Sequence, residues 1–462
     1  MKLKKNCQMI CIAFFVTMAL LSYVLYNSCA VNTASCSNLV TKQPEVVPHD
    51  EVLKLSFSKS TTVNNSVDLT PGFAEDLVRC NRLNVMALES YAYRYDALRL
   101  FIPPSEQFLT DFKNPCWYVN YTFPSNFQYL HYYNRRDIPL SSDLKLLSHF
   151  TRTDSKPVKS LQCLPYFYLV GFPKCGTTAL MHYIQKHPEY IPSCTKEPHW
   201  WGNYHILGEK NKDVASVLYY LKCFDDAAQK ITRLPRKMIT GEGSTTTIWK
   251  RPIYVNHDSD RLACETPLLI ESIQPGAKYI VMIREPIDFL YSAFWYFCKL
   301  IKKKDPQTFH EYVERSLEWW KTCTQNYSTV QCVYNTRINS SDPGCGRLRQ
   351  LVHPYIFVSI WLQVIPKERM LFVKTEELKK KPVDVVREVY KFLEISPLSD
   401  KLLTNIVKVQ HINEQNFLHS TEDQTFEMLP STRDLLLKFY KPFNEKLAQL
   451  LNDGRFLWKD VH

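Results

Sequence analysis

The fold of this 462-residue chain is decided by the stretch YFYLVGFPKCGTT, residues 166–178. Its first five residues, 166–170, form a continuous aromatic and β-branched run, which is typical of a short buried strand. A turn containing glycine and proline follows, and residues 177–186 then have the composition of a helix. The stretch therefore predicts a buried strand, a tight loop and a helix, in that order.

The same alternation recurs further along the chain. Residues 278–283 and 369–374 repeat the strand pattern, and residues 287–297 and 384–394 have the apolar spacing of helices that pack against a sheet. Strands that alternate with helices are typical of a parallel sheet with helices on its faces. We therefore predict an α/β fold with a P-loop-like parallel sheet flanked by helices.

Two glycines, Gly171 and Gly176, stand five positions apart at the first strand-to-helix turn. In such a turn, backbone N–H groups and the helix N-terminus can surround a phosphate without a side chain intervening. The loop resembles a P-loop, but Thr177 stands where nucleotide triphosphatases have lysine, and the lysine is displaced to Lys174. The pattern predicts a phosphate-binding loop whose lysine meets a different leaving group, and a plain turn is the alternative.

A second candidate segment follows the strand expected at residues 278–283. Arg284 stands at its carboxyl end, where a guanidinium could hold a phosphate through two hydrogen bonds. Ser292 comes eight positions later, two turns along the expected helix, and could donate its hydroxyl to the same group. A surface ion pair between Arg284 and Glu285 is the alternative interpretation.

Composition and charge narrow the possible classes of protein. With 45% hydrophobic residues, 13% aromatic residues and only 11 glycines, the chain is neither disordered throughout nor collagen-like. The net charge is +11, and it is +8 without Lys2, Lys4 and Lys5. This excess favours an anionic partner, and by itself leaves nucleic acid, a polyanionic glycan, a phosphorylated cofactor and a membrane surface open.

The N-terminus carries a candidate membrane anchor. Residues 7–26 contain no charged side chain, and their number is about the 20 that cross a bilayer as a helix. Because the three preceding lysines favour the cytosolic side, we expect residues 1–6 to be a cytoplasmic tail and the remainder to be luminal. A signal peptide cleaved near Ala30 is the alternative.

The luminal part is expected to consist of a stem and one domain. Residues 27–94 are rich in Ser, Thr and Asn and show little periodicity, which favours a stem, and residues 95–462 form the domain. The chain has 15 cysteines, an odd number that implies at least one free thiol or intermolecular bridge. The cysteines at 323, 332 and 345 predict a local disulfide region without a zinc-binding pattern. Four glycosylation sequons agree with a lumen: Asn64, Asn120, Asn326 and Asn339.

Together, the two loop segments resemble those of sulfotransferases that use 3′-phosphoadenosine 5′-phosphosulfate. The first resembles their 5′-phosphosulfate loop and the second their 3′-phosphate segment. Further segments, from about Asn114 to Lys459, resemble the Golgi carbohydrate sulfotransferases. They are NPCW (114–117), CLPYFY (163–168), KEPHWW (196–201), GEGS (241–244), the stretch from Cys323 to CVYN (332–335), and FYKPFN (439–444).

The resemblance implies a sulfotransferase fold and a single-pass type II protein of the Golgi membrane. The enzyme would transfer a sulfuryl group from this donor to a glycosaminoglycan hydroxyl, with no metal and no nucleic acid partner. The implied acceptor is the 6-hydroxyl of N-acetylgalactosamine 4-sulfate in chondroitin or dermatan sulfate. The alternatives are transfer to another glycan such as heparan sulfate, a luminal P-loop kinase, and a non-catalytic glycan-binding membrane protein. The oligomeric state stays open.

The resemblance also implies roles for individual residues. Lys174 would stabilise the bridging oxygen as its bond to sulfur breaks, and Glu197 would be the general base. His199 is the alternative base because imidazole titrates nearer neutrality, and Glu242 is a third candidate. A surface pair of Glu197 with Lys196 and a packed core histidine are the non-catalytic alternatives. The donor-binding positions are Lys174, Cys175, Gly176, Thr177, Thr178, Arg284 and Ser292.

The chain departs from the family pattern at two places. Residues 352–355, VHPY, stand where the family usually has Gly-Leu-Tyr, and no clear Lys-Gly-Arg occurs near the C-terminus. Arg347 and Arg349 are the substitutes to test for the missing 3′-phosphate contact. The family's bridged segment implies that Cys323 pairs with Cys332, and we expect Cys175 to stay reduced.

Overall fold

The computed structural model describes residues 101–119, 159–204, 217, 220–249, 265–298, 301, 304–334, 354–408 and 427–459. The chain divides into two units, residues 1–67 and 68–462, and every described residue belongs to the second. The expected tail, anchor and stem, the domain start at residue 95, and Arg347 and Arg349 therefore lie outside the described residues. Within the described ranges, no helix is both long enough and apolar enough to span a bilayer.

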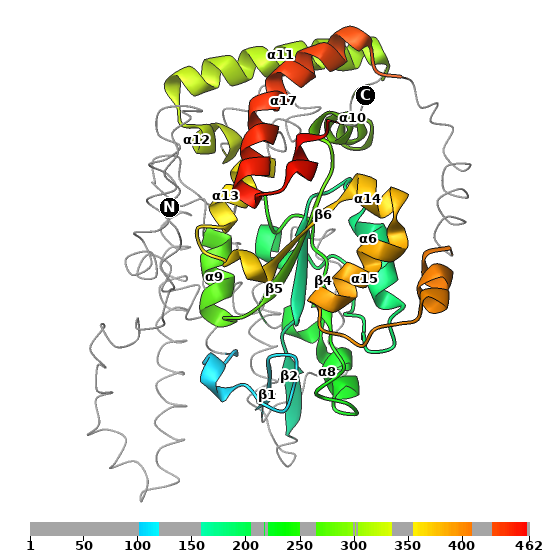
Figure 1. Ribbon diagram of the computed structural model, residues 1–462. Helices are drawn as coiled ribbons and strands as arrows, with labels where there is room; N and C mark the ends of the chain where they lie inside the picture. Colours follow the sequence, from blue (N-terminus) through cyan, green and yellow to red (C-terminus); the bar gives the residue numbers. More distant parts are fainter. Residues whose placement is uncertain are drawn as a thin grey trace, which may run out of the picture. The chain divides into compact units, whose positions relative to one another are not determined.

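A four-stranded parallel sheet with the order β4-β3-β5-β6 forms the centre of the described structure (Figure 1). Every residue of β3 is buried, and so are the last five of β5, as expected for apolar strands covered on both faces. The parallel sheet predicted from the sequence is confirmed. Its strands are β3 (Phe167–Gly171), β4 (Gly241–Glu242), β5 (Lys278–Ile283) and β6 (Met370–Lys374).

Helices cover both faces of this sheet. Figure 1 shows α6 (Thr177–Gln185), α14 (Thr375–Lys380) and α15 (Pro382–Phe392) on one side, with α9 (Glu265–Ile273) and α13 (Pro354–Trp361) on the other. The first group is joined by a hydrogen bond from the Tyr390 hydroxyl of α15 to the Tyr183 carbonyl of α6 (2.7 Å). The helices expected at 177–186, 287–297 and 384–394 are confirmed within two residues at each end.

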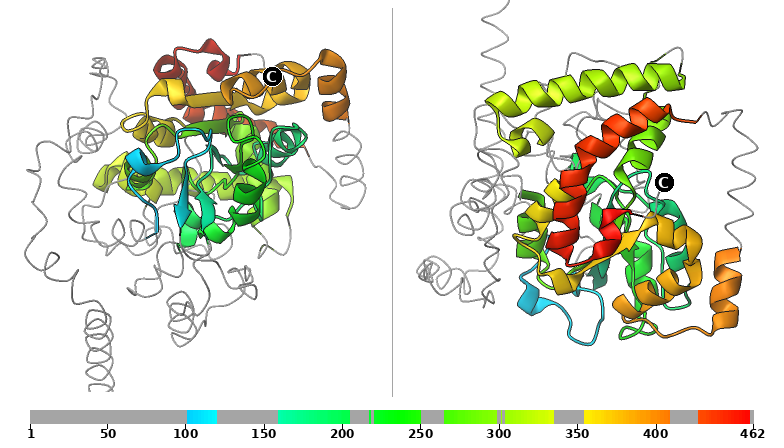
Figure 2. Two further views of the ribbon diagram at one scale, coloured as in Figure 1. Left: turned by 90° about the horizontal axis from the view of Figure 1, so that it is seen from below. Right: turned by 45° about the horizontal axis from the view of Figure 1, so that its top comes forward.

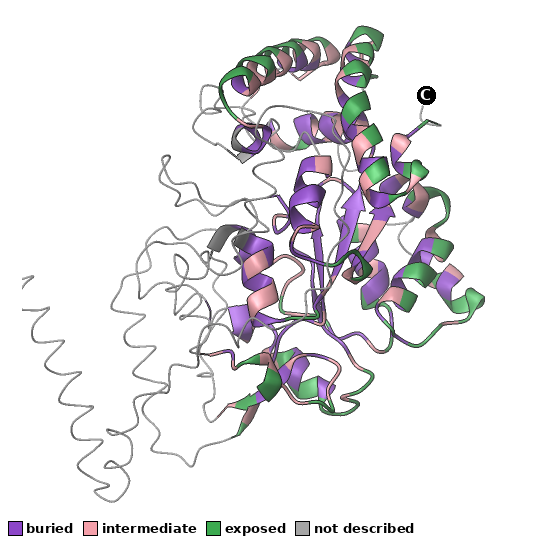
Figure 3. Ribbon diagram, turned by 60° about the vertical axis from the view of Figure 1, so that its left-hand side comes forward, coloured by how far each residue is buried: buried purple, intermediate pink, exposed green. Residues whose placement is uncertain are grey.

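Aromatic side chains fill the interface between the sheet and the second group of helices. Tyr168 of β3 and Tyr279 of β5 are neighbours in register, and their ring centroids are 5.7 Å apart. Trp361 of α13 meets Tyr279 edge-on at 5.3 Å, and the Tyr168 hydroxyl donates to Gln274 just after α9 (2.8 Å). Figure 3 shows the strands buried between the layers. The aromatic composition noted in the sequence therefore serves this core.

Three longer helices pack together near the carboxyl ends of the strands, as the right-hand view of Figure 2 shows. They are α10 (Pro286–Phe297), α11 (Pro306–Asn326) and α17 (Pro430–Leu451). Each begins with proline in its first turn, where the missing N–H is not needed. The short helix α12 (Thr329–Tyr334) is tied to α11 by the disulfide Cys323–Cys332, so this predicted pairing is confirmed.

The sequence did not indicate the smaller elements. The antiparallel pair β1 (Cys116–Val119) and β2 (Ser160–Cys163) is closed by a disulfide between Cys116 and Cys163. Other short elements are α8 (Asp225–Ile231), the π-helical turn η3 (Trp200–Tyr204), and the 3₁₀ turns η1 (Ser105–Gln107), η5 (Lys367–Arg369) and η6 (Gly454–Leu457).

The strand order places both predicted loops at one point of the sheet. From β3 the chain proceeds to β4 on one side, whereas from β5 it proceeds to β6 on the other. The chain therefore leaves the neighbouring strands β3 and β5 in opposite directions. Open α/β sheets bind ligands at the carboxyl ends of two strands that are connected in this way. The loop after β3 and Arg284 after β5 both start there.

Candidate active site

The loop after β3, residues 172–176, is flanked by two glycines: Gly171 ends β3, and Gly176 ends the loop. A Cβ atom at Gly171 would stand 2.2 Å from Cγ2 of Ile248, so only glycine lets the end of β3 pack this closely. Gly176 is the N-cap of α6 and has a φ of 79°, which glycine adopts without steric cost. Both glycines of the motif are therefore required by the backbone geometry, the first for close packing and the second for a left-handed φ.

Contacts from the two neighbouring strand ends hold the loop. The hydroxyl of Thr375, directly after β6, donates to the Cys175 carbonyl (2.8 Å), and the Phe172 N–H donates to the Met282 carbonyl of β5 (2.8 Å). Lys174 has a φ of 62°, which is unfavourable for a residue with a side chain. Such a conformation persists where the surroundings impose it, and it is concentrated at functional sites.

The helix α6 begins at the end of this loop. The first backbone hydrogen bond of the helix runs from the Leu180 N–H to the Gly176 carbonyl (3.1 Å). The N–H groups before Leu180 therefore have no partner inside the helix. Thr177 is buried, whereas Thr178 is exposed at the same helix end. Helix N-termini with free N–H groups bind phosphate and sulfate, so this end suits the predicted ligand.

Cys175 contributes its backbone to the loop rather than its side chain. The thiol is free, and the residue is only 1% exposed. Burial raises the pKa of the Cys175 thiol to about 12, so the group is neutral at physiological pH. The expected reduced state of Cys175 is confirmed, and only its backbone groups are placed to meet a ligand.

Two cationic side chains meet at the loop. Arg284, directly after β5, donates from Nη1 to the Lys174 carbonyl (3.4 Å). The Nζ atom of Lys174 lies 3.9 Å from the ring centroid of Tyr296 in α10. Burial, and then the nearby charge of Arg284, lower the pKa of Lys174. The charge of Arg284 therefore acts on the Lys174 ammonium, and an anion bound beside the two groups would reduce their repulsion.

The segment after β5 does not use Arg284 in a surface pair with Glu285. The buried Glu285 carboxylate caps α10 by accepting a hydrogen bond from the Asp288 N–H (2.8 Å). Arg284 reaches the loop instead. Ser292 is half-buried in α10, and the described residues contain no hydrogen bond between it and the loop. Among the described residues, the structure thus joins Arg284, but not Ser292, to the loop by a hydrogen bond.

The predicted base Glu197 lies in a cluster of donors. Its Oε2 atom is 3.0 Å from Nε2 of His199 and accepts a hydrogen bond from the Thr245 hydroxyl (3.1 Å). Its Oε1 atom accepts a charge-assisted hydrogen bond from Nζ of Lys196. Burial alone raises the pKa of Glu197, but the hydrogen bond from His199 and the charge of Lys196 outweigh it and lower this pKa to about 2. The carboxylate is therefore ionised throughout the physiological range.

His199 is also held in a defined orientation. Its Nδ1 atom lies 2.8 Å from the Thr246 hydroxyl, and its backbone N–H donates to the Ser244 hydroxyl (2.8 Å). Its φ of 52° is left-handed, as at Lys174. Both ring nitrogens have polar partners, the Thr246 hydroxyl and the Glu197 carboxylate, so His199 is not a core histidine packed only between aromatic side chains. It orients Glu197 in this structure.

The segment that carries Glu197 is anchored from two directions. The Lys196 carbonyl accepts from the Gly243 N–H (3.0 Å), which continues the pairing beyond β4. Further back, Cys194 is bonded to Cys223 by a disulfide, and its N–H donates to the Cys223 carbonyl (2.8 Å). These contacts set the path of the backbone that leads up to Glu197.

Residues 244–248 connect the base cluster to the donor loop. The Thr245 hydroxyl contacts Glu197, and the Ile248 N–H donates to the Val170 carbonyl at the end of β3 (3.0 Å). The same Ile248 packs against Gly171 at the start of the loop. The structure therefore joins the two predicted groups of residues through one short segment.

Glu242 is not accessible to an acceptor in this arrangement. It is 1% exposed at the end of β4, and its Oε2 atom accepts a hydrogen bond from the Tyr220 hydroxyl. Burial raises the pKa of Glu242 to about 7. Because the side chain lies beneath the surface, Glu242 is a poor candidate for the base that meets a sugar hydroxyl.

Several residues that shape the site were not found from the sequence. Thr375 was recognisable in principle, because it follows the carboxyl end of the strand beside β5. The hydroxyls of Ser244, Thr245 and Thr246 and the disulfide Cys194–Cys223 carried no local signal. Their roles depend on contacts across the fold.

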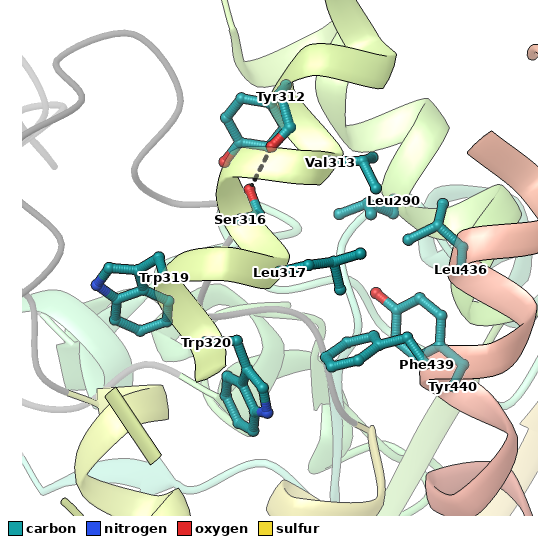
Figure 4. Close-up of a pocket in the computed structure, with 10 residues that line it drawn as sticks. All are labelled: Leu290, Tyr312, Val313, Ser316, Leu317, Trp319, Trp320, Leu436, Phe439 and Tyr440. Carbon is teal, nitrogen blue, oxygen red and sulfur yellow. Dashed lines mark hydrogen bonds between the residues drawn. The ribbon is translucent and has the colours of Figure 1, made fainter. Parts of the chain in front are cut away.

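A separate apolar pocket lies where α10, α11 and α17 meet (Figure 4). Leu290, Leu317 and Leu436 line it together with aromatic rings, and the Ser316 hydroxyl is used in a hydrogen bond to the Tyr312 carbonyl (2.7 Å). Its lining contains no cationic side chain and none of the predicted site residues. The pocket is therefore unsuited to a phosphate, and its walls support α10.

Comparison with known proteins identifies the family to which the chain is similar. Residues 165–428 match the family model described as the sulfotransferase domain. The chain is 34% identical over 391 residues to carbohydrate sulfotransferase 15 of Mus musculus, covering 78% of this chain and 68% of that protein. It is 24% identical over 301 residues to heparan sulfate glucosamine 3-O-sulfotransferase 3A1 of Mus musculus, covering 62% and 63%.

Solved structures include similar chains at low identity. The crystal structure of a sulfotransferase from Alicyclobacillus acidocaldarius aligns with a TM-score of 0.40 and 20% identity, covering 63% of this chain and 97% of that one. The family model, by contrast, spans more than half of the chain and includes both predicted loops. The chain therefore belongs to the sulfotransferase family and is a sulfotransferase related to carbohydrate sulfotransferase 15.

Proposed function

We propose that this enzyme transfers a sulfuryl group from 3′-phosphoadenosine 5′-phosphosulfate to a glycosaminoglycan hydroxyl. The observation that carries the proposal is the meeting of Lys174 and Arg284 at the loop after β3, beside the N-terminus of α6. An anionic donor with phosphate groups at both ends suits this placement, since cations and free N–H groups converge there. The +11 charge of the chain points the same way.

The loop and Arg284 would divide the donor between them. The backbone N–H groups of residues 175–178 would hold the 5′-phosphosulfate end, and Arg284 would hold the 3′-phosphate, with Ser292 as its further donor. The fit is supported by the left-handed Gly176, which keeps a side chain out of the backbone's approach to the phosphate. Lys174 would stabilise the phosphate oxygen that gains charge when its bond to sulfur breaks.

On the acceptor side, Glu197 would take the proton of the hydroxyl as its oxygen bonds to sulfur. The proton ends on the Glu197 carboxylate, and the electron pair of the broken S–O bond stays with the departing phosphate. His199 would keep Glu197 oriented and is the base in the alternative form of the proposal. Residues 244–248, which contact both Glu197 and the end of β3, support the placing of the two reactants in line.

For the acceptor, we propose the 6-hydroxyl of N-acetylgalactosamine 4-sulfate in chondroitin or dermatan sulfate. The similarity to a protein named carbohydrate sulfotransferase 15 supports a sugar acceptor, and the net positive charge supports a polyanionic one. Heparan sulfate is the second candidate, because a relative named for heparan sulfate glucosamine is 24% identical.

Two measurements test the donor and the acceptor. Calorimetry should detect binding of 3′-phosphoadenosine 5′-phosphate, and much weaker binding of ATP with Mg²⁺, since a kinase would show the reverse. Disaccharide analysis after incubation with labelled donor should place the label on 4-sulfated N-acetylgalactosamine. Label on heparan glucosamine would make heparan sulfate the acceptor, and label on tyrosine peptides would contradict both glycan proposals.

We further propose that the enzyme is a luminal, single-pass type II protein of the Golgi membrane. The uncharged residues 7–26 support an anchor, and the disulfides support an oxidising compartment. Asn326, exposed at the end of α11, suits N-glycosylation. Protease added to sealed microsomes should spare the chain after the anchor, and carbonate washing should leave it on the membrane. Recovery only of a secreted chain that starts near Ala30 would contradict the anchor.

A further inference from the structure

The two carboxylate oxygens of Glu197 have different partners. Oε2 is held by His199 and Thr245, which orient the group. Oε1 is held by the ammonium of Lys196. Any hydroxyl that gives its proton to Glu197 needs a lone pair on one of these oxygens. Because Oε2 has two partners from the surrounding protein, Oε1 is the oxygen that can be released.

The Lys196 side chain can leave Oε1 without disturbing the backbone. The Lys196 carbonyl is fixed by the Gly243 N–H, so the position of its Cα does not depend on the ion pair. The side chains of Lys196 and Glu197 are 20% and 27% exposed, so both are in reach of a ligand at the surface. The other titratable groups that face Glu197 are His199, which already holds Oε2, and the buried Glu242 of β4.

We propose that Lys196 selects acceptors that carry an anionic group beside the reacting hydroxyl. Such a group draws the ammonium away from Oε1 of Glu197, and the freed oxygen can then accept the proton. The inference rests on the proposed function, in which the reacting hydroxyl belongs to a sugar that already carries a sulfate. Lys196 binds the acceptor and acts on the chemistry only through Glu197, so it is a selecting and positioning residue.

The physical reason is that Lys196 exchanges one anion for another. Removing the ammonium from Glu197 without replacement would break a partly buried, charge-assisted hydrogen bond. A sulfate on the acceptor provides a new partner, so the exchange has little net penalty. A neutral sugar offers none, and Oε1 stays occupied. The acceptor's existing sulfate should therefore lower KM and raise kcat together.

The test compares two acceptors, chondroitin 4-sulfate and unsulfated chondroitin, with three variants. In Lys196→Met the ratio of kcat/KM between the two acceptors should fall about ten- to hundredfold, the loss of one charge-assisted contact. The change should come from a higher KM for the sulfated chain and a raised kcat for the unsulfated chain. Lys196→Arg keeps the charge and should retain most of the preference. Lys186→Met, an exposed lysine just after α6, is the control and should match wild type.

The possible failures are distinguishable. If wild type transfers sulfate to neither chondroitin chain, the proposed acceptor is wrong and the inference falls with it. If wild type uses both chains equally, or Lys196→Met keeps the preference within threefold, the proposed function stands and the inference is wrong. An equal loss with both acceptors in Lys196→Met, restored by Lys196→Arg, would show that the lysine only supports Glu197, which also overturns selection.

Discussion

The donor loop and the segment around Glu197 belong to one candidate site, but the chain builds them differently. The donor loop is continuous, since residues 171–178 run from the end of β3 into α6. The base cluster is assembled from parts far apart in the chain: Glu197 and Thr245 are 48 positions apart, and a disulfide over 29 positions anchors the segment. The residues of the first region are contiguous, although Arg284 and Thr375 hold its backbone from distant parts of the chain, whereas the second region is itself put together from separate segments.

This difference predicts how each region responds to change. A local loop keeps its backbone when a side chain is removed, so substitutions there should act on the ligand contact itself. A cluster assembled from distant segments depends on its anchors, so a change that touches no substrate can still displace the base. Small displacements matter because transfer requires the reacting atoms to be aligned.

The largest effect should come from Glu197→Gln. The amide keeps the shape of the side chain but cannot take the proton, so kcat should fall about 10²–10⁴-fold while the donor Kd changes little. The pKa of about 2 means that Glu197 is ionised between pH 5 and 8, so the loss in kcat/KM should not vary with pH over that range. Exposed Glu388 provides the control Glu388→Gln, measured in the same sulfate-transfer assay. Near-normal turnover would make His199 the base.

In the donor loop, Lys174→Ala should reduce kcat about 10²–10³-fold, the usual loss when one group that stabilises developing charge is removed. The fold should survive, because Arg284 and Thr375 hold the carbonyls of Lys174 and Cys175, and the Lys174 side chain makes neither contact. Circular dichroism and thermal unfolding check the fold, and single-turnover transfer checks the chemistry. A large fall in Tm would mean that the fold depends on the Lys174 side chain, which contradicts this prediction.

Two disulfides allow a matched test of whether a distant contact positions the base. Replacing Cys194 and Cys223 by serine, or Cys116 and Cys163 by serine, should each lower the free energy of unfolding by about 2–4 kcal/mol. Only the first change should also lower kcat, by up to about 10²-fold, because it releases the segment before Glu197. Denaturant unfolding and steady-state kinetics separate the two effects. Equal kcat values in both double variants would show that the disulfide between Cys194 and Cys223 does not position the base.

The smallest effects are expected at the segment after β5. Arg284→Ala should weaken donor binding about ten- to hundredfold through the loss of a charge-assisted contact, with a smaller effect on kcat. Ser292→Ala should weaken it at most about tenfold, since a neutral hydroxyl contributes less. Calorimetry with 3′-phosphoadenosine 5′-phosphate measures both. An unchanged Kd in the Arg284 variant would refute the 3′-phosphate role.

The strands and the loop could be predicted because their signals lie within short stretches. Residues 166–170 and 278–283 are apolar runs, and the strands β3 and β5 follow them within one residue. Gly176 marks the turn because no other residue adopts its φ as easily. The position of Arg284 followed from the rule that ligands meet the carboxyl ends of parallel strands. In each case the physical cause acts over a few residues.

The sequence by itself thus determined the parallel α/β core and the glycine-flanked loop between β3 and α6, and its resemblance to a family marked Glu197 as the first candidate for the base. Only the tertiary structure decided that Thr375 closes on Cys175, 200 positions away, that Glu242 is buried, and that Thr245 and His199 hold Oε2 of Glu197 while the adjacent Lys196 takes Oε1. Periodicity and turn chemistry are properties of neighbouring residues. Which oxygen of a carboxylate is occupied depends on how distant segments pack, and no short stretch of sequence contains that information.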